Sequence, residues 1–358
     1  MNLIKNILNQ KTPFEQDSEF RSTDFLEEMK NLMEHHYENS EEFRNIIINN
    51  EYVLTSNKLE ELPFIPTRLF KLLDLKSISE SEIFKVMTSS GTSGQSVSKI
   101  FLDRSSASIQ TKVLNHIVKS CLGKKRKDML IIDSEETIKD RKKFSARTAG
   151  ILGFSSFGRN HTYALDKDLE LNLEKVQDFI SSSNKNPIVI FGFTFMIWKN
   201  FFLKIQSENF NVCFPKNSIL LHGGGWKKLH SEQVDNELFK ESLKKIGINY
   251  VFDYYGMIEQ TGSIFIECSQ GYLHCSDYSE VIVRNTQTLE PVGFNQEGII
   301  QVLSLLPRSY PGNSLLTEDL GVVLGEDDCK CGKKGKYFII SGRMKESEIR
   351  GCSDTRVI

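Results

Sequence analysis

The chain has 358 residues, enough for one large domain or two and for a sizeable hydrophobic core. Its 45 basic and 47 acidic side chains give a formal charge of -2, which offers no argument for a nucleic-acid partner. We find no apolar run long enough to span a bilayer and no signal-peptide pattern. Seven cysteines, an odd number, favour a reducing compartment, so we expect a cytoplasmic protein.

Residues 1–60 are expected to form an N-terminal helical segment. Residues 1–20 carry no clear pattern, and we expect them to be loosely ordered. Asp24 and Glu27 have the spacing of a capping box, and the apolar residues after them recur at helical intervals, which predicts a helix. A second helix is predicted over residues 41–49.

Residues 61–262 are expected to form an α/β core. Two prolines in segment 61–71 bar a regular helix, so we expect this segment to be extended and apolar. Helix and strand signals then alternate, with strands predicted over 129–133, 187–192, 218–221 and 249–253 and helices over about 103–122, 194–207 and 231–246. Strands followed by glycine-bearing turns and helices predict active loops at the strand ends.

Residues 263–358 are expected to form a smaller β-rich subdomain with a C-terminal tail. Short strands dominate this part, predicted over 280–284, 298–303 and 337–340.

Ser, Thr and Gly are concentrated in the run 88–95, which lies between two apolar segments. Such a run is a poor helix and a poor strand. Its N–H and O–H groups suit anionic oxygens, and Gly lets the backbone approach them closely. A flexible linker is the alternative, although a linker more often has polar surroundings. We therefore predict a phosphate-binding loop, supported by Lys99 shortly after it.

Three further motifs follow in order: a Tyr-Gly-Met-Ile-Glu run at 255–259, an acidic loop Thr-Glu-Asp-Leu-Gly at 317–321, and Gly-Arg-Met-Lys-Glu at 342–346. Each motif alone is weak, because all three kinds occur by chance in soluble proteins. Their order and spacing together are much more specific.

This order resembles that of the adenylate-forming (AMP-binding) enzymes. Within that superfamily the chain resembles the acyl-protein synthetases of the LuxE family, through segments 63–71 and 348–354, and more distantly the phenylacetate–CoA ligases. The resemblance implies an α/β fold like the superfamily's N-terminal core, with a smaller β-rich subdomain. Because twelve residues follow Glu346, we expect the usual mobile C-terminal domain to be missing.

The resemblance also implies site residues for ATP and Mg²⁺. Glu259 is assigned to Mg²⁺, Asp319 to the ribose hydroxyls, and Arg343 to the ribose or phosphates. The full set of predicted nucleotide-binding residues is Ser89, Ser90, Gly91, Thr92, Ser93, Gly94, Lys99, Gly223, Gly224, Gly225, Tyr255, Gly256, Glu259, Asp319, Arg343 and Lys345. Lys99 and Arg343 are also predicted to be catalytic, because adenylation depends on positioning and on holding negative charge.

Several of these assignments have alternatives. Glu259 could be a surface carboxylate at a helix cap, and Asp319 an ordinary turn residue. Gly223, Gly224 and Gly225 could form a flat wall for adenine or an acyl chain, or a tight turn with Trp226 in the core. The neighbouring His222 is expected to pack or hydrogen-bond rather than act as a base.

Cys352 is predicted to accept the acyl group. A thiolate attacks an acyl-adenylate readily, a cysteine near a chain end is mobile, and Arg350 beside it favours the thiolate. The alternative is an idle, exposed thiol.

A metal site is predicted separately from Cys268, His274, Cys329 and Cys331, because three thiolates and an imidazole form a closed tetrahedral zinc set. Cys275 could replace His274. The alternative is a set of scattered reduced thiols.

The predicted function is ATP-dependent activation of a fatty or other carboxylic acid, with transfer of the acyl group to Cys352 for a reductase-like or acyl-transferase partner. Two alternatives stay open. One is a ligase that passes the acyl group to CoA, a carrier protein or a sugar amine. The other is a non-catalytic protein that binds a nucleotide or an acyl group.

Overall fold

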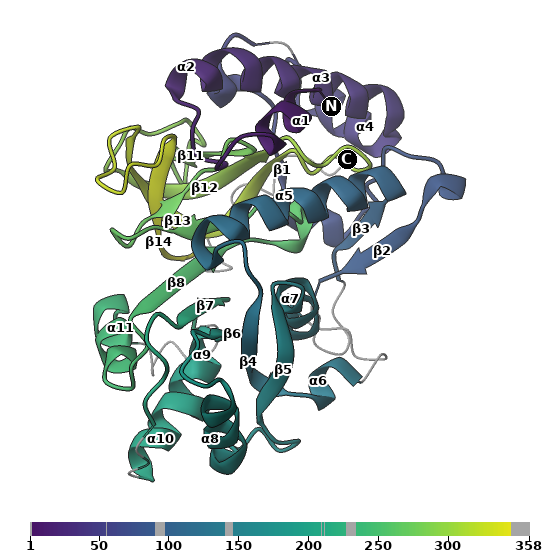
Figure 1. The fold of residues 1–358 in the computed structure, drawn as a ribbon. Coiled ribbons are helices and arrows are strands. Elements are labelled where there is room, and N and C mark those ends of the chain that lie inside the picture. The colour runs from purple at the N-terminus through teal and green to yellow at the C-terminus, as the bar shows by residue number, and fades with distance from the viewer. Residues whose placement is uncertain are drawn as a thin grey trace. The chain divides into compact units, whose positions relative to one another are not determined.

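The computed structural model describes residues 2–54, 56–89, 97–139, 146–208, 210, 212–226 and 234–344. The chain divides into two compact units, the first made of residues 1–117 and 256–358 and the second of residues 118–255 (Figure 1). The boundary after residue 117 lies inside the helix that covers 104–122, and the boundary after residue 255 directly follows the strand that covers 250–255. The three segments predicted from the sequence, with boundaries after residues 60 and 262, stay a prediction.

The second unit is built on a parallel sheet in the strand order β5-β4-β6-β7-β8. The strands are β4 Lys127–Ser134, β5 Gly158–Leu165, β6 Val189–Phe193, β7 Ile219–Gly223 and β8 Tyr250–Tyr255. All five residues of β6 are buried, as expected for a central parallel strand covered on both faces. The predicted α/β class is confirmed, although β5 is not among the predicted strands.

Helices accompany this sheet. They are α6 Glu136–Lys139, α7 Ala146–Ser155, α8 Leu173–Ser182, α9 Thr194–Met196, a π-helical turn Ile197–Phe202, α10 Leu203–Ser207 and α11 Asn236–Lys244. The helix predicted over 194–207 is confirmed. The helix predicted from residue 231 begins later, at Asn236, because Asp235 caps it by accepting from the Leu238 N–H. Residues 231–233 lie outside the described residues.

The first unit contains an antiparallel sheet in the order β11-β12-β13-β14-β10-β9, with β1 pairing in parallel with β13. Its strands are β1 Ile65–Pro66, β9 Phe265–Glu267, β10 Leu273–His274, β11 Ser279–Arg284, β12 Glu297–Ser304, β13 Ser314–Glu326 and β14 Lys336–Arg343. A separate hairpin pairs β2 Lys85–Thr88 with β3 Lys99–Leu102. The predicted β-rich part is therefore present.

The N-terminal helices are α1 Asn2–Leu8, α2 Ser18–Phe20, a π-helical turn Arg21–Phe25, α3 Leu26–Asn39 and α4 Glu41–Asn49, and Figure 1 shows them beside the β11–β14 strands. The expectation that residues 1–20 are loosely ordered is wrong, because burial of Ile4, Ile7, Phe14 and Phe20 holds them in place. The predicted cap at Asp24 is also wrong. Asp17 caps the helix earlier, by accepting from the N–H groups of Glu19 and Phe20. The helix over 41–49 is confirmed.

The connection to the core is made of short pieces: 3-10 turns Leu59–Glu61, Thr67–Lys71 and Glu80–Glu82. Segment 61–71 is extended at Leu62 and in strand Ile65–Pro66, but the residues after Pro66 turn into a 3-10 helix. Its prolines do exclude a regular α-helix, but the expectation of a fully extended segment is wrong.

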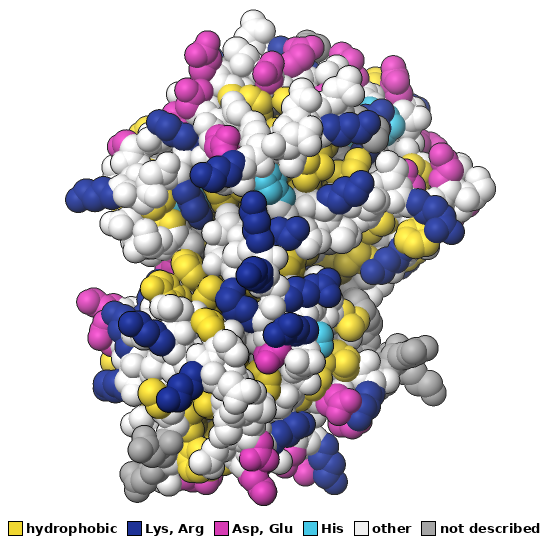
Figure 2. All heavy atoms as spheres, viewed as in Figure 1, with side chains coloured by type: hydrophobic (Ala, Val, Ile, Leu, Met, Phe, Trp, Pro, Cys, Tyr) yellow, Lys and Arg dark blue, Asp and Glu magenta, His cyan; other side chains and the backbone are white. Residues whose placement is uncertain are grey.

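Helix α5, Arg104–Leu122, is capped by Asp103, whose Oδ1 accepts from the Ser106 N–H at 2.7 Å. The helix contains no acidic residue. Its exposed basic side chains are Arg104, Lys112 and Lys119, and Figure 2 shows Lys and Arg side chains over this helix. None of the helices among the described residues combines the length and apolar character needed to cross a membrane.

Candidate active site

The hairpin β2–β3 holds together the two ends of the hydroxyl-rich loop. The Ser89 N–H donates to the Ser98 carbonyl at 3.0 Å, and the Ser98 N–H donates to Ser89 Oγ at 2.9 Å. Lys99 begins β3 opposite Thr88 and pairs with Asp74 at 3.0 Å. The predicted phosphate-binding residues Ser90, Gly91, Thr92, Ser93 and Gly94 lie outside the described residues. The base of the loop is therefore a closed, hydrogen-bonded hairpin end.

Glu259 lies four residues after the end of β8, in the 3-10 turn Ile258–Gln260. Its side chain is buried, so the alternative of a surface cap is wrong. Gln260 fixes the turn: its Nε2 donates to the Val302 carbonyl at 3.0 Å and to the Gly312 carbonyl at 2.9 Å. Sequence reasoning missed Gln260, although it directly follows the predicted Glu259.

Burial raises the pKa of the Glu259 carboxyl. The Ser98 hydroxyl and the Lys71 ammonium act in the opposite direction, while the Glu318 carboxylate raises this pKa further. Glu259 therefore lies within electrostatic reach of the loop base and of the acidic motif. A buried carboxylate near a second carboxylate is a suitable environment for a divalent cation with hard oxygen ligands. Ser98 and Lys71 were not predicted, because only the folded chain brings them to Glu259.

The acidic motif lies within strand β13, so the expectation of a loop is wrong. Ile299 pairs with Leu320 and Gln301 with Leu316, so a single β12 residue faces three β13 residues, 317–319. Thr317 stabilises this bulge: its Oγ1 donates to the Ile300 carbonyl at 2.7 Å and accepts from the Asp319 N–H at 3.1 Å. Bulges of this kind redirect side chains and are frequent beside active sites.

Asp319 and Arg343 are brought together as cross-strand partners on β13 and β14. Arg343 Nη2 donates to Glu318 Oε2 at 2.8 Å, and Arg343 Nε lies 3.8 Å from Asp319 Oδ1. The alternative of Asp319 as a turn residue is wrong, because it lies in a strand. Lys345 and Cys352 lie outside the described residues.

In the second unit, Gly223 is the last residue of β7, and Gly224 and Gly225 follow it. A Cβ on Gly223 would lie 2.8 Å from the Tyr254 carbonyl oxygen, so the close approach of β7 and β8 requires glycine there. Gly224 and Gly225 have φ values of 79° and 55°, a left-handed conformation that favours glycine, and the chain bends at Gly224. Trp226 then packs edge-to-face against Phe239.

His222 hydrogen-bonds through Nδ1 with Thr194 Oγ1 at 2.9 Å, and Nδ1 lies 3.6 Å from Asp253 Oδ1. Burial lowers the pKa of His222 to about 3, with a smaller contribution from Lys240. The imidazole is therefore neutral near pH 7. The expectation that His222 packs and hydrogen-bonds is confirmed.

The four predicted metal residues are brought together in the first unit. The donor atoms of Cys268, His274, Cys329 and Cys331 all lie within 4.8 Å of one another. Cys275, the residue after β10, is not among them. His274, not Cys275, is therefore the fourth member of the cluster.

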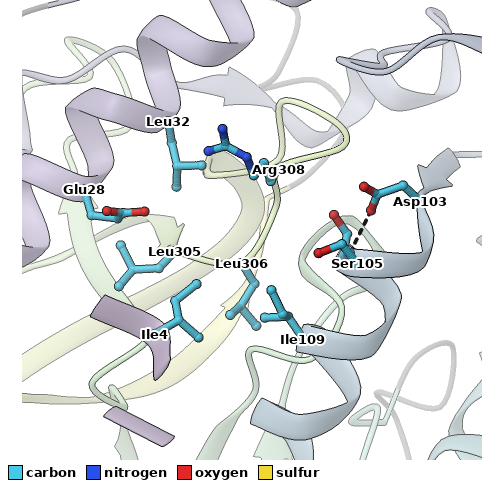
Figure 3. Close-up of a pocket in the computed structure, with 10 residues that line it drawn as sticks. Ile4, Glu28, Leu32, Asp103, Ser105, Ile109, Leu305, Leu306 and Arg308 are labelled. Carbon is cyan, nitrogen blue, oxygen red and sulfur yellow. Dashed lines mark hydrogen bonds between the residues drawn. The ribbon is translucent and has the colours of Figure 1, made fainter. Parts of the chain in front are cut away.

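A cavity of about 170 Å³ lies elsewhere in the first unit. Figure 3 shows side chains around it from α1, α3 and α5, from the residue before α5 and from the loop after β12. The cavity is lined by Ile4, Glu28, Leu32, Asp103, Ser105, Ser106, Ile109, Leu305, Leu306 and Arg308. Small-molecule sites usually measure roughly 300–1,000 Å³. The cavity is small for a nucleotide, and none of the predicted nucleotide or metal residues lines it.

The fold matches the crystal structure of a 2-hydroxyisobutyryl-CoA ligase in the postadenylation state in complex with 2-HIB-AMP. The TM-score is 0.68 and the identity 18%, over 93% of this chain and 70% of that chain. The chain therefore has the fold of the adenylate-forming ligases. A family model for the acyl-protein synthetases, LuxE, matches residues 2–357, so the chain belongs to that family of enzymes.

Two relatives are both described as long-chain-fatty-acid–luciferin-component ligases. The relative from Aliivibrio fischeri is 25% identical over 300 residues, which are 80% of this chain and 76% of the relative. The relative from Vibrio harveyi is 24% identical over 337 residues, which are 91% of this chain and 85% of the relative. The predicted family, and with it the prediction of a ligase, is confirmed.

Proposed function

We propose that this enzyme uses ATP to convert a long-chain fatty acid into its acyl-adenylate and then transfers the acyl group to its own Cys352. In the first step a carboxylate oxygen attacks the α-phosphorus of ATP, and the bond to the pyrophosphate breaks. In the second step the Cys352 thiolate attacks the acyl carbonyl carbon, and AMP leaves with the electron pair. The product is a thioester that keeps the acyl group activated.

The observation that carries the proposal is the surrounding of Glu259 in the first unit. The Ser98 hydroxyl at the loop base and the Glu318 carboxylate of the acidic motif both influence its pKa. The base of the hydroxyl-rich loop and the acidic motif therefore lie within electrostatic reach of Glu259, which supports a site for a metal-bound nucleotide.

Each group has a role that fits its chemistry. Glu259 holds Mg²⁺, which neutralises charge on the ATP phosphates when it is bound. The loop residues Ser89 to Gly94, with Lys99, bind the phosphate oxygens. Asp319 accepts hydrogen bonds from the ribose hydroxyls. Arg343, held beside Asp319, offers its remaining guanidinium donors to the nucleotide.

A protein partner removes the acyl group, because an enzyme that stores its product as a thioester must be discharged before the next turnover. A reductase-like or acyl-transferase protein has the required chemistry. The relatives' description names a luciferin component as the acyl acceptor of those proteins. Because the acceptor thiol must stay reduced, we place the enzyme in the cytoplasm.

The test uses the purified protein with Mg-ATP and a radiolabelled long-chain fatty acid. We expect label on the wild-type protein that neutral hydroxylamine releases, and no label on Cys352→Ser. Cys213→Ser, which removes an exposed thiol elsewhere, is the matched control and should label normally. Pyrophosphate exchange should persist in Cys352→Ser, because adenylation precedes acyl transfer.

Two outcomes would contradict the proposal. Exchange without labelling, together with acyl transfer to added CoA, would indicate an ordinary CoA ligase. Absence of both exchange and labelling with fatty acids of several lengths would favour a non-catalytic binding protein.

A further inference from the structure

Two donor pairs of the Cys/His cluster have the spacing of a tetrahedral zinc site. Cys268 Sγ lies 3.9 Å from Cys329 Sγ, and Cys331 Sγ lies 3.4 Å from His274 Nε2. With Zn–S near 2.3 Å and Zn–N near 2.05 Å, a regular tetrahedron gives about 3.8 Å between sulfurs and about 3.6 Å between sulfur and nitrogen. A disulfide would need about 2.05 Å between sulfurs. The donors are therefore spaced for a metal ion rather than for a bridge.

Two turns of the same design present the three cysteines. In the turn that begins at Cys268, the Gly271 N–H donates to the Cys268 carbonyl at 3.0 Å, and Gly271 has φ 82°. In the turn that begins at Cys329, the Gly332 N–H donates to the Cys329 carbonyl at 2.9 Å, and Gly332 also has φ 82°. Each turn folds the backbone around a sulfur, an arrangement suited to holding thiolates at a metal.

Backbone N–H groups also point at the sulfurs. The Gln270 N–H donates to Cys268 Sγ at 3.3 Å, and the Lys333 N–H donates to Cys331 Sγ at 3.5 Å. In both cases the donor lies two residues after the cysteine. Such bonds stabilise a sulfur that carries negative charge, because the thiolate is the form that binds metal.

The donor set is closed. Cys268, His274 and Cys329 are buried, and Cys331 is half-buried. Four protein donors fill a tetrahedral zinc ion and leave no position for water or substrate, which is typical of structural zinc. Catalytic zinc keeps an open position, so this cluster has no direct part in acyl chemistry.

The N-terminal stretch before α2 is attached to the same two turns. The Phe14 ring meets the His274 ring edge-on at 6.3 Å, and the Lys334 N–H donates to the Phe14 carbonyl at 3.1 Å. The Asp277 N–H donates to the Pro13 carbonyl at 2.8 Å. This stretch therefore contacts His274 of the Cys/His cluster, and also Asp277 and Lys334, which lie three positions after His274 and Cys331.

We propose that Cys268, His274, Cys329 and Cys331 bind one structural zinc ion, and that this ion holds the N-terminal residues 13–16 on the sheet of the first unit. Zinc joins the 268–274 turn to the 329–331 turn, which together form the surface under Phe14. Without zinc the two turns lose this direct link, and the N-terminal stretch loses its fixed support. This proposal does not depend on acyl transfer to Cys352.

The first experiment measures metal in the purified full-length protein by mass spectrometry. We expect about one zinc per chain, retained on a chelating column. Cys329→Ser should lower this content severalfold, whereas Cys213→Ser and Cys275→Ser, both outside the cluster, should keep it. Replacement of zinc by Co²⁺ should give the visible absorption bands of tetrahedral thiolate coordination, which reports the site even if Cys329→Ser folds poorly.

The second experiment measures hydrogen–deuterium exchange of wild type before and after removal of the metal by a strong chelator. We expect amides of residues 14–18 to exchange at least tenfold faster after removal, while amides of β6 in the second unit stay unchanged. Less than a tenth of an equivalent of metal, both as purified and after refolding with zinc, would overturn the site. Unchanged exchange at residues 14–18 would overturn the link to the N-terminus.

Discussion

Gln260→Leu tests whether the turn that carries Glu259 is held by two side-chain hydrogen bonds. The Gln260 side chain is 1% exposed, and its Nε2 donates to the carbonyls of Val302 and Gly312. Leucine has a similar volume, so the variant removes both bonds without a large cavity. Each net hydrogen bond contributes about 1 kcal/mol, and carbonyls left buried without a donor increase the loss, which gives a cost of about 2–4 kcal/mol.

Thermal unfolding followed by circular dichroism measures this cost. A loss of 2 kcal/mol should lower the midpoint by about 4–8 °C in a unit of this size. Gln287→Leu, at an exposed position, is the matched control and should change stability by less than about 0.5 kcal/mol. The variant should also need more Mg²⁺ for pyrophosphate exchange. A midpoint for Gln260→Leu equal to that of the control would refute the reasoning.

Three further predictions concern backbone fit and pH. Gly223→Ala should lower the free energy of unfolding, measured by urea titration, by about 1–3 kcal/mol, because its Cβ would lie 2.8 Å from the Tyr254 carbonyl oxygen. Gly153→Ala is the control: its Cβ would meet no described atom within 4 Å, so this variant should be neutral or stabilising. Glu259→Gln should abolish pyrophosphate exchange. It should also stabilise the fold at neutral pH, because burial raises the pKa of Glu259 and so disfavours its charged form in the folded protein. Denaturant titrations that show the same gain in unfolding free energy at pH 4 as at pH 7 would contradict this explanation. Burial lowers the pKa of His36 to about 3 from its ordinary 6.5, so below pH 6.5 the unfolded chain binds a proton that the folded chain does not. The free energy of unfolding therefore decreases as the pH is lowered below 6.5. His36→Gln should reduce that slope by up to about 1.4 kcal/mol per pH unit.

Local sequence patterns predict the elements in which a cap and a periodic apolar face agree. Helix 41–49 is such a case, because Ser40 caps it while Phe43 and Ile47 are buried. Strand β13 is the opposite case, because acidic residues and glycines interrupt its sequence. Its strand conformation comes from pairing with β12 on one side and β14 on the other, which no local pattern records.

The residues of the candidate site likewise include some that the sequence predicts and some that only the folded chain reveals. Residue type and spacing were sufficient to predict the Cys/His set, because few chemistries use three thiols and an imidazole. The choice of His274 over Cys275 needed the folded chain, which places the His274 ring and not the Cys275 thiol beside the other three donors. Ser98 and Gln260 could not be predicted, because their roles come from contacts with residues distant in the sequence.

The N-terminal stretch also makes the order of synthesis important. The N–H groups of Glu15 and Gln16 donate to the Asp277 carboxylate, across separations of 262 and 261 residues. A ribosome that adds about 5–20 residues per second needs roughly 13–50 s to produce this interval. Until then Phe14 has no surface on which to dock, whereas the second unit, residues 118–255, is complete 22 residues before Asp277 is added. Nascent chains should therefore complete the sheet of the second unit first and expose their N-terminal apolar residues to chaperones until Asp277 and Lys334 have been added.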